Sequence, residues 1–156
     1  MPQIAAGVQY KDNVDFDVVP KALGAKRSHD FDFYLAATKV YLGALAGRNV
    51  LLNGVVRATR ANQLGLLGFG GDKRDSYSAR FEGTAGVFLR DNLLLGAEYR
   101  SKPDNLSAFR EQSWSDVFLA YVPNKHVAVV GAYAKLGDVA DKQNQHAWYV
   151  SGQLSF

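Results

Sequence analysis

Cysteine is absent from the 156-residue sequence, and proline occurs only 4 times. Without cysteine the chain has no disulfide framework and no thiolate metal site. No apolar run approaches the roughly 20 residues that a transmembrane helix requires. The start, MPQIAAGVQYKDN, lacks the basic and long apolar segments of a secretory signal peptide. These absences exclude a disulfide scaffold and a bundle of membrane helices.

A large excess of one sign of charge is also lacking. The formal net charge is +3, and the basic residues are scattered along the chain rather than gathered in a stripe. Nucleic-acid-binding domains usually carry such a stripe, so we expect no nucleic-acid partner. The histidines have no spacing that suits a metal site, and no motif indicates a cofactor.

Alternation of apolar and polar residues runs from end to end, and helical periodicity is weak. With 15 glycines and 12% aromatic residues, this pattern predicts an all-β fold in a single domain over residues 1–156. Eight strands are expected. They are Gln3–Lys11, Phe31–Leu45, Val50–Ala61, Tyr77–Arg90, Asn92–Ser101, Ser113–Val122, His126–Gly137 and Gln145–Phe156. In Phe31–Leu45 both faces look apolar.

Short and long connections alternate between these strands. The short turns are Ala46–Asn49, Arg90–Asn92 and Val122–Lys125, and the long loops are Asp12–Asp30, Asn62–Ser76, Lys102–Gln112 and Asp138–Asn144. In an antiparallel up-and-down meander all short turns then lie on one rim and all long loops on the other. Bacterial outer-membrane barrels have this asymmetry.

Alternation alone does not say which face is inside, because a soluble lipocalin-like barrel has the same period with its apolar residues inward. The unequal loops favour a membrane barrel. So do aromatic residues near the expected strand ends, which suit an interfacial girdle. They are Tyr10, Tyr77, Tyr99, Tyr121, Trp148 and Phe156.

The last strand runs to the final residue, with apolar residues at every second position. Unpaired backbone groups are costly in hydrocarbon, so this strand is expected to pair with the first and close the barrel. Its apolar series resembles the signal by which outer-membrane barrels are recognised for assembly. The series is Trp148, Val150, Gly152, Leu154 and Phe156.

Charged residues are expected on the opposite, lumen-facing side of the sheet. A hairpin centred on Asp91 would place Glu82 opposite Arg100, where opposite charges attract across the strands. The predicted lumen-facing set is Arg57, Arg80, Glu82, Glu98, Arg100, Asp116 and Lys135. It would either line a solute-selecting channel or form a salt-bridge network. In an eight-stranded barrel side chains just fill the interior, which favours the network.

Two motifs resemble catalytic or phosphate-binding sequences only superficially. Ser28, His29 and Asp30 are consecutive, and neighbours in an extended chain point to opposite sides, so they cannot converge as a triad. The glycine-rich stretch Leu64–Asp75 lacks a serine or threonine after Lys73, unlike a phosphate loop. We expect this stretch to be an external loop or one that folds inward as a constriction.

Several stretches together resemble the domain-of-unknown-function family three thousand and thirty-four. They are PQIAAGVQYK, DFYLAATKVYL, LLNGVVRATRANQLGLLGFGGD, LLLGAEYRSKPDN, VPNKHVAVVGAYAKLGD and WYVSGQLSF. The resemblance implies a Gram-negative envelope protein and an outer-membrane barrel. It also suggests the C-terminal portion of longer family members, so the eight strands would be a complete small barrel or the last eight of a larger one. It implies no enzymatic activity.

We therefore expect a transmembrane β-barrel in the outer membrane of a Gram-negative bacterium, acting as a passive channel component or a structural barrel and not as an enzyme. Its expected partners are membrane lipid, the outer-membrane barrel assembly machinery and a small solute. Two alternatives stay open. One is a soluble lipocalin-like ligand-binding barrel, and the other is an outer-membrane lipid-modifying enzyme with a Ser–His–acid cluster.

Overall fold

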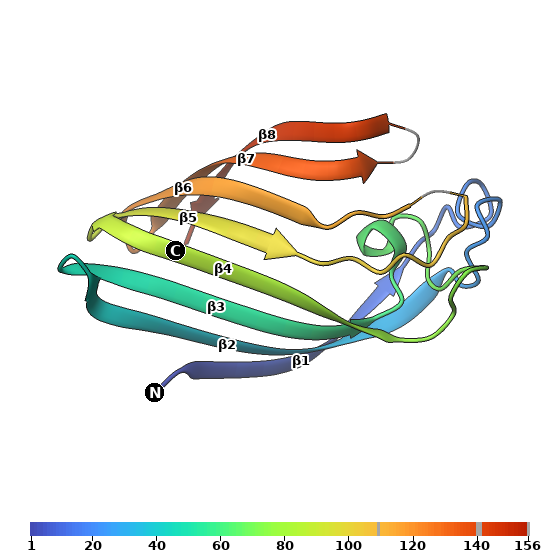
Figure 1. The fold of residues 1–156 in the computed structure, drawn as a ribbon, viewed down its shortest axis with the longest axis horizontal. Helices are drawn as coiled ribbons and strands as arrows, with labels where there is room; N and C mark the ends of the chain where they lie inside the picture. Colours follow the sequence, from blue (N-terminus) through green and yellow to red (C-terminus); the bar gives the residue numbers. More distant parts are fainter. Residues whose placement is uncertain (109, 140–141, 156) are drawn as a thin grey trace.

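A computed structural model describes residues 1–108, 110–139 and 142–155. One eight-stranded antiparallel sheet contains the strands in sequence order, each hydrogen-bonded to the next (Figure 1). The strands are β1 (Gln3–Asp12), β2 (His29–Leu45), β3 (Arg48–Thr59), β4 (Ser78–Arg90), β5 (Leu93–Arg100), β6 (Trp114–Asn124), β7 (Val127–Val139) and β8 (Lys142–Leu154). A 3-10 turn, η1 (Asn62–Gly65), follows β3. The predicted all-β, up-and-down order of eight strands is confirmed.

Tight turns connect the strands along one rim. Between β2 and β3, Ala46 and Gly47 both have left-handed backbone conformations, with φ of 49° and 77°. Two such residues form the turn whose twist matches a hairpin. Between β6 and β7, the Asn124 carboxamide oxygen accepts hydrogen bonds from the backbone N–H groups of His126 and Val127 at 2.9 and 3.1 Å. Local turn chemistry therefore sets this rim.

The predicted long loop at Asp138–Asn144 is wrong. Strand β7 continues to Val139, which pairs with Lys142 at the start of β8. The register shifts on both sides of Gly137, whose φ is 67°. Such bulges absorb extra residues without ending the ladder, so a polar sequence can remain in the strands. The long loops that the structure does show are residues 13–28, 60–77, and 101–108 with 110–113.

The sheet is strongly curved, with chemically different faces. Asn53 of β3 and Tyr149 of β8 line the same cavity, although four strands lie between β3 and β8 in the sheet. The face that carries these two residues is therefore concave. The opposite, convex face carries large apolar side chains that are exposed. They include Ile4, Val8, Phe33, Leu35, Val56, Phe81, Leu95, Val117, Val150 and Leu154.

The sheet is open in this structure. Strands β1 and β8 are its two edges, and no pairing joins them within the described part of the chain. Figure 1 shows the two edge strands well separated, with the intervening strands curving from one to the other. The expected pairing of the last strand with the first is therefore not formed here.

The buried apolar core lies at the long-loop rim rather than between layers of strands. Its largest side chains, Phe69 and Leu106, are each 1% exposed. The backbone of Phe69 bridges to Arg27 and to Ala61, which ties the first two long loops together. We call this assembly of residues 13–28, 60–77, 101–108 and 110–111 the rim cap. It covers one end of the concave face.

Candidate functional site

Charged side chains of alternating sign cross the concave face from β1 to β5. Lys11 Nζ lies 2.8 Å from Asp32 Oδ2, and Arg57 Nη1 lies 3.6 Å from the same oxygen. Arg57 Nε then lies 2.8 Å from Glu82 Oε1, and Arg100 Nη2 lies 3.1 Å from Glu82 Oε2. We call this series the charge ladder. Each carboxylate is shared by two cations, so the ladder connects strands far apart in sequence.

The strand register of the β4–β5 hairpin agrees with the prediction. Glu82 pairs with Arg100, and Thr84 pairs with Glu98. The Thr84 hydroxyl donates a hydrogen bond of 3.0 Å to Glu98 Oε1. The structure reaches this pairing through a bulge between Phe88 and Arg90, because the two-residue turn of Asp91 and Asn92 alone would place Glu82 opposite Ser101.

The other predicted lumen residues divide between the two faces. Arg80 is paired directly with Arg57, and Asp116 is paired directly with Glu98, so both lie on the concave face. Lys135 does not. It pairs with Ser115, the partner of Tyr99 on the convex face. A register that differs by one residue reverses the face, and β6 and β7 are joined by a turn whose bulge the sequence did not reveal.

Asp32 is central to the charge ladder but was not among the predicted lumen-facing residues. Its side chain is 1% exposed and contacts cations from β1 and β3. The signal was present in the segment HDFDFY (29–34), where Asp30 and Asp32 alternate with Phe31 and Phe33. The mostly apolar stretch 35–45, interrupted by Thr38 and Lys39, obscured this alternation, so β2 looked apolar on both faces.

At the start of β2, Asp30 makes polar contacts with Arg60 and Tyr77. Its carboxylate accepts hydrogen bonds from Arg60 Nε at 2.6 Å and Nη2 at 2.9 Å, and from the Tyr77 hydroxyl at 2.9 Å. Ser28 Oγ lies 3.1 Å from His29 Nδ1. The serine and histidine thus touch, while the Asp30 carboxylate is engaged by an arginine and a tyrosine.

Within the rim cap, a buried polar network joins the second long loop to the third. Lys102 Nζ donates to Gln63 Oε1 at 3.0 Å, and the Gln63 backbone N–H donates to Glu111 Oε2 at 3.0 Å. Lys102 Nζ also lies 3.9 Å from the centre of the Trp114 ring. Burial lowers the pKa of Lys102 to about 8 and raises the pKa of Glu111 to about 7. Both groups therefore titrate near neutral pH.

Two of the cavities along the concave face are lined by residues of the charge ladder. The first, about 380 Å³, is next to the rim cap and is lined by both ladder carboxylates and a surplus of cations; we call it the ladder cavity. Its charged lining residues are Lys11, Asp32, Arg57, Arg80, Glu82, Arg100 and Lys102. The second, about 620 Å³, shares Glu82 and Arg100 with it and adds the acidic pair Glu98 and Asp116. The face is thus basic near the loops and more acidic beyond them.

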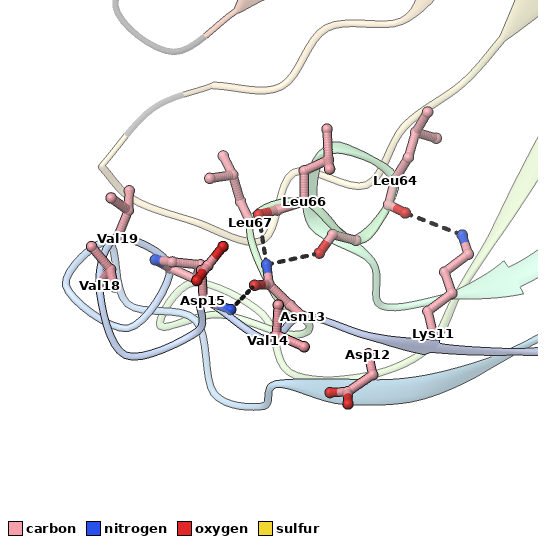
Figure 2. Close-up of a pocket in the computed structure, with 12 residues that line it drawn as sticks. Lys11, Asp12, Asn13, Val14, Asp15, Val18, Val19, Leu64, Leu66 and Leu67 are labelled. Atoms are coloured by element: carbon pink, nitrogen blue, oxygen red, sulfur yellow. Dashed lines mark hydrogen bonds between the residues drawn. The ribbon is translucent and has the colours of Figure 1, made fainter.

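A third hollow, of about 790 Å³, lies outside the sheet between the first two long loops (Figure 2). Asn13 holds it together, because its side-chain nitrogen donates to the backbone oxygens of Leu66 and Gly65 at 2.7 and 3.2 Å. Val18 and Leu66 lie at its wall and are exposed. The glycine-rich stretch is thus a loop that contacts the first long loop at the outside of the sheet.

Aromatic side chains form neighbouring pairs on the convex face, two of them close to the long-loop rim and one, Tyr133 with Trp148, at the middle of β7 and β8. Ring centres are 5.2 Å apart for Tyr10 and Phe31, 5.9 Å for Phe33 and Tyr77, and 4.9 Å for Tyr133 and Trp148. These rings and Tyr99 are all at least partly exposed, and Tyr121 lies near the short-turn rim.

The predicted assembly series lies on β8, an edge strand that pairs on one side only. Trp148, Val150 and Leu154 of β8 are exposed, and Gly152 lies between them on the same face. Phe156 lies outside the described residues.

Among the described residues, no group of three or more histidine, cysteine, aspartate or glutamate side chains could hold a metal ion. In the same residues, no helix has the length and apolar character needed to cross a membrane.

These features define an all-β protein built on one open, antiparallel up-and-down sheet with a charged concave face and an apolar convex face. The chain belongs to the family described as "Protein of unknown function (DUF3034)", which matches residues 1–153. The prediction that the chain corresponds to the C-terminal portion of the family is wrong, because the match covers nearly the whole chain. No curated protein and no solved structure matches the chain.

Proposed function

We propose that this chain is a transmembrane β-barrel protein of the Gram-negative outer membrane, with a structural or passive role and no catalytic activity. The distribution of side chains between the two faces carries the proposal. Large apolar side chains are exposed across the convex face, and ion pairs occupy the concave face. A soluble lipocalin-like barrel would have the reverse arrangement.

The energetics of the convex face support a lipid environment. Leaving a large aliphatic or aromatic side chain in water forgoes roughly 1.5–3 kcal/mol relative to full burial. Val150 is 77% exposed, Ile4 66% and Val8 60%, and many neighbours are similar. Monomeric soluble proteins rarely expose an apolar surface that covers a whole face of a sheet. Lipid acyl chains would cover this surface at little cost.

Lipid surroundings also require the sheet to close. The outer edges of β1 and β8 present unpaired backbone groups, and each such group costs several kcal/mol in hydrocarbon. We infer that β1 and β8 pair with each other in the bilayer. The two strands are antiparallel in an even-numbered meander, so this closure keeps the hydrogen-bonding pattern of the rest of the sheet.

The aromatic pairs Tyr10–Phe31 and Phe33–Tyr77 near the long-loop rim suit one membrane interface, where rings combine an apolar body with a polar tip. Within the barrel, the charge ladder would narrow the lumen with paired side chains and leave the cavities of the concave face beside it. A structural barrel, or a passage for very small solutes, follows from this narrowing. Membrane lipid and the barrel assembly machinery, acting on β8, are the proposed partners.

Refolding from urea tests the proposal. We expect the chain to regain β-structure in detergent micelles and in phospholipid vesicles, and to migrate differently on electrophoresis before and after boiling. In detergent-free buffer we expect aggregation, because the convex face has no cover. A folded, detergent-independent monomer would overturn the proposal and favour the lipocalin-like alternative. In planar bilayers, we expect no large, steady conductance from the folded protein.

A further inference from the structure

The ladder cavity contains an unusual placement of two like charges. Arg57 and Arg80 are direct cross-strand partners on β3 and β4, on the face that lines this cavity. Like charges directly opposite each other in a sheet are destabilising. Such a pair persists when other interactions compensate for the repulsion. The groups around each arginine therefore show whether the protein itself supplies that compensation.

Arg57 has its compensation within the protein, since Glu82 and Asp32 both lie within ion-pair distance. Arg80 differs. In the described part of the chain, its hydrogen bond goes from Nε to the Ser78 hydroxyl at 3.0 Å, and no carboxylate comes within 4.0 Å. The nearest ladder carboxylate, Glu82, is already shared by Arg57 and Arg100.

The rest of the cavity lining adds positive charge. Lys102 is 5% exposed, and its ammonium donates to an uncharged group, the Gln63 carboxamide oxygen. Burial lowers the pKa of Lys102 to about 8, and the nearby Arg100 lowers it further, while Glu111 opposes the change. Glu111, across the network, acts on both Lys102 and Arg80, but burial keeps much of it protonated at neutral pH, with a pKa of about 7.

We propose that the ladder cavity is a binding site for a small oxyanion, a phosphate or carboxylate group, with the Arg80 guanidinium as its principal ligand. Arginine binds such groups through two parallel hydrogen bonds, and Arg80 uses only Nε within the described structure. Lys102 and Arg100 provide further positive charge at the same cavity. The volume of about 380 Å³ holds inorganic phosphate or a small dicarboxylate but not a folded macromolecule.

This site does not depend on the membrane proposal, because its lining comes from the concave face and the rim cap in the chain as folded here. The ligand is a soluble anion rather than a lipid headgroup, since the convex face is the one that would contact lipid. Working in a non-ionic, phosphate-free detergent separates the two sources, because phosphate must then be added.

The test is calorimetric titration of the folded protein with inorganic phosphate at pH 6.5 and low chloride. We expect saturable binding that R80Q weakens at least tenfold. The matched control is R90Q, which changes an arginine at the other end of the same strand, outside the ladder cavity. We expect R90Q to bind within twofold of the parent protein, with all three proteins checked for equal β-structure by circular dichroism.

A second variant, K102Q, covers the case in which R80Q does not fold. It retains a hydrogen-bonding side chain beside Gln63 and removes one charge from the lining, so weaker phosphate binding is expected. Added chloride should compete in every binding-competent protein. The proposal is overturned if the folded parent protein shows no saturable binding, or if R90Q loses as much affinity as the variants in the cavity.

Discussion

At the scale of single residues, the concave face is organised by carboxylates shared between cations. Glu82 bridges Arg57 and Arg100, with its side chain 14% exposed. Glu98 has a different environment, since it accepts a hydrogen bond from Thr84 and lies directly opposite the like-charged Asp116. Two glutamates on adjacent strands of one hairpin therefore make opposite electrostatic contributions.

Replacing each glutamate by glutamine should separate these contributions. E82Q removes the charge that two arginines share, and we expect it to lower the free energy of unfolding by about 1–3 kcal/mol. E98Q removes repulsion with Asp116 and keeps a hydrogen-bond acceptor for Thr84, so we expect no loss or a small gain. Urea unfolding of the micelle-folded protein, followed by circular dichroism, measures both. Equal losses in E82Q and E98Q would contradict a ladder that depends on Glu82.

The buried Glu111 predicts a pH dependence of the rim cap. Burial raises its pKa from 4.5 to about 7, so the folded state holds a proton that the unfolded state has released. The stabilisation from the protonated form is complete below pH 4.5 and is lost as the pH rises through 7. This pKa shift corresponds to a loss of stability of the folded state on the order of 3 kcal/mol.

Hydrogen exchange measures this effect, as protection factors for the loop residues 60–77 and 101–108 between about pH 5 and 7. We expect protection to fall across this window in the parent protein, and E111Q to flatten the fall. Lys102 contributes little here, because its lowered pKa of about 8 gives a stability change only at higher pH. An identical pH slope in E111Q would show that another group is responsible.

At the scale of elements, adjacent residues of each strand face opposite sides of the sheet and therefore two different environments. In β8, Val150 lies on the convex face opposite Gly131, and Ser151 lies on the concave face opposite Val130. Val150 is 77% exposed to solvent in the structure. In water a charge at either position would be tolerated, but lipid on the convex side would make the two positions very different.

Arginine substitution at both positions is thus a matched test of the membrane face. V150R should cost about 2–4 kcal/mol in lipid vesicles, because a charge near the bilayer midplane is expensive. S151R should cost much less, because that side chain points to the polar interior. Unfolding in vesicles measures both variants. Similar small costs for V150R and S151R would argue against lipid contact with the convex face.

At the scale of the whole molecule, the main question is how the two edges of the open sheet are satisfied. Strands β1 and β8 each pair on one side only in the described structure. The rim cap holds the long loops of the first six strands together, through contacts such as Asn105 with Asn62 at 2.9 Å. The stretch from β7 to β8 is tied in mainly by its own hairpin ladder and by β6, so closure requires this hairpin to approach β1.

Paired cysteines test closure directly, since the chain has no native cysteine. Ala5 of β1 is on the concave face, as are Tyr149, Ser151 and Gln153 of β8. We expect one of the three pairs formed by A5C with Y149C, S151C or Q153C to give an intramolecular disulfide in vesicles. Such a bond needs Cα atoms within about 7 Å.

The control is A5C with A128C on β7, which should not cross-link because one strand intervenes after closure. Cross-links between two chains in place of the intramolecular bond would show edge pairing between copies. Absence of any cross-link in vesicle-folded protein would contradict closure by β1 and β8.

The sequence by itself determined the number, order and antiparallel pairing of the strands, because alternation and turn residues are local signals. It also predicted the pairing of Glu82 with Arg100, which the structure confirms, although a bulge between Phe88 and Arg90 that the sequence did not indicate is needed to reach it. Only the tertiary structure decided the face of Lys135, the role of Asp32, the contact of the glycine-rich loop with Asn13 and the open edge between β1 and β8. Each of these depends on bulges that shift register, on contacts between strands distant in sequence, or on sheet curvature, and alternation along a single strand carries none of that information.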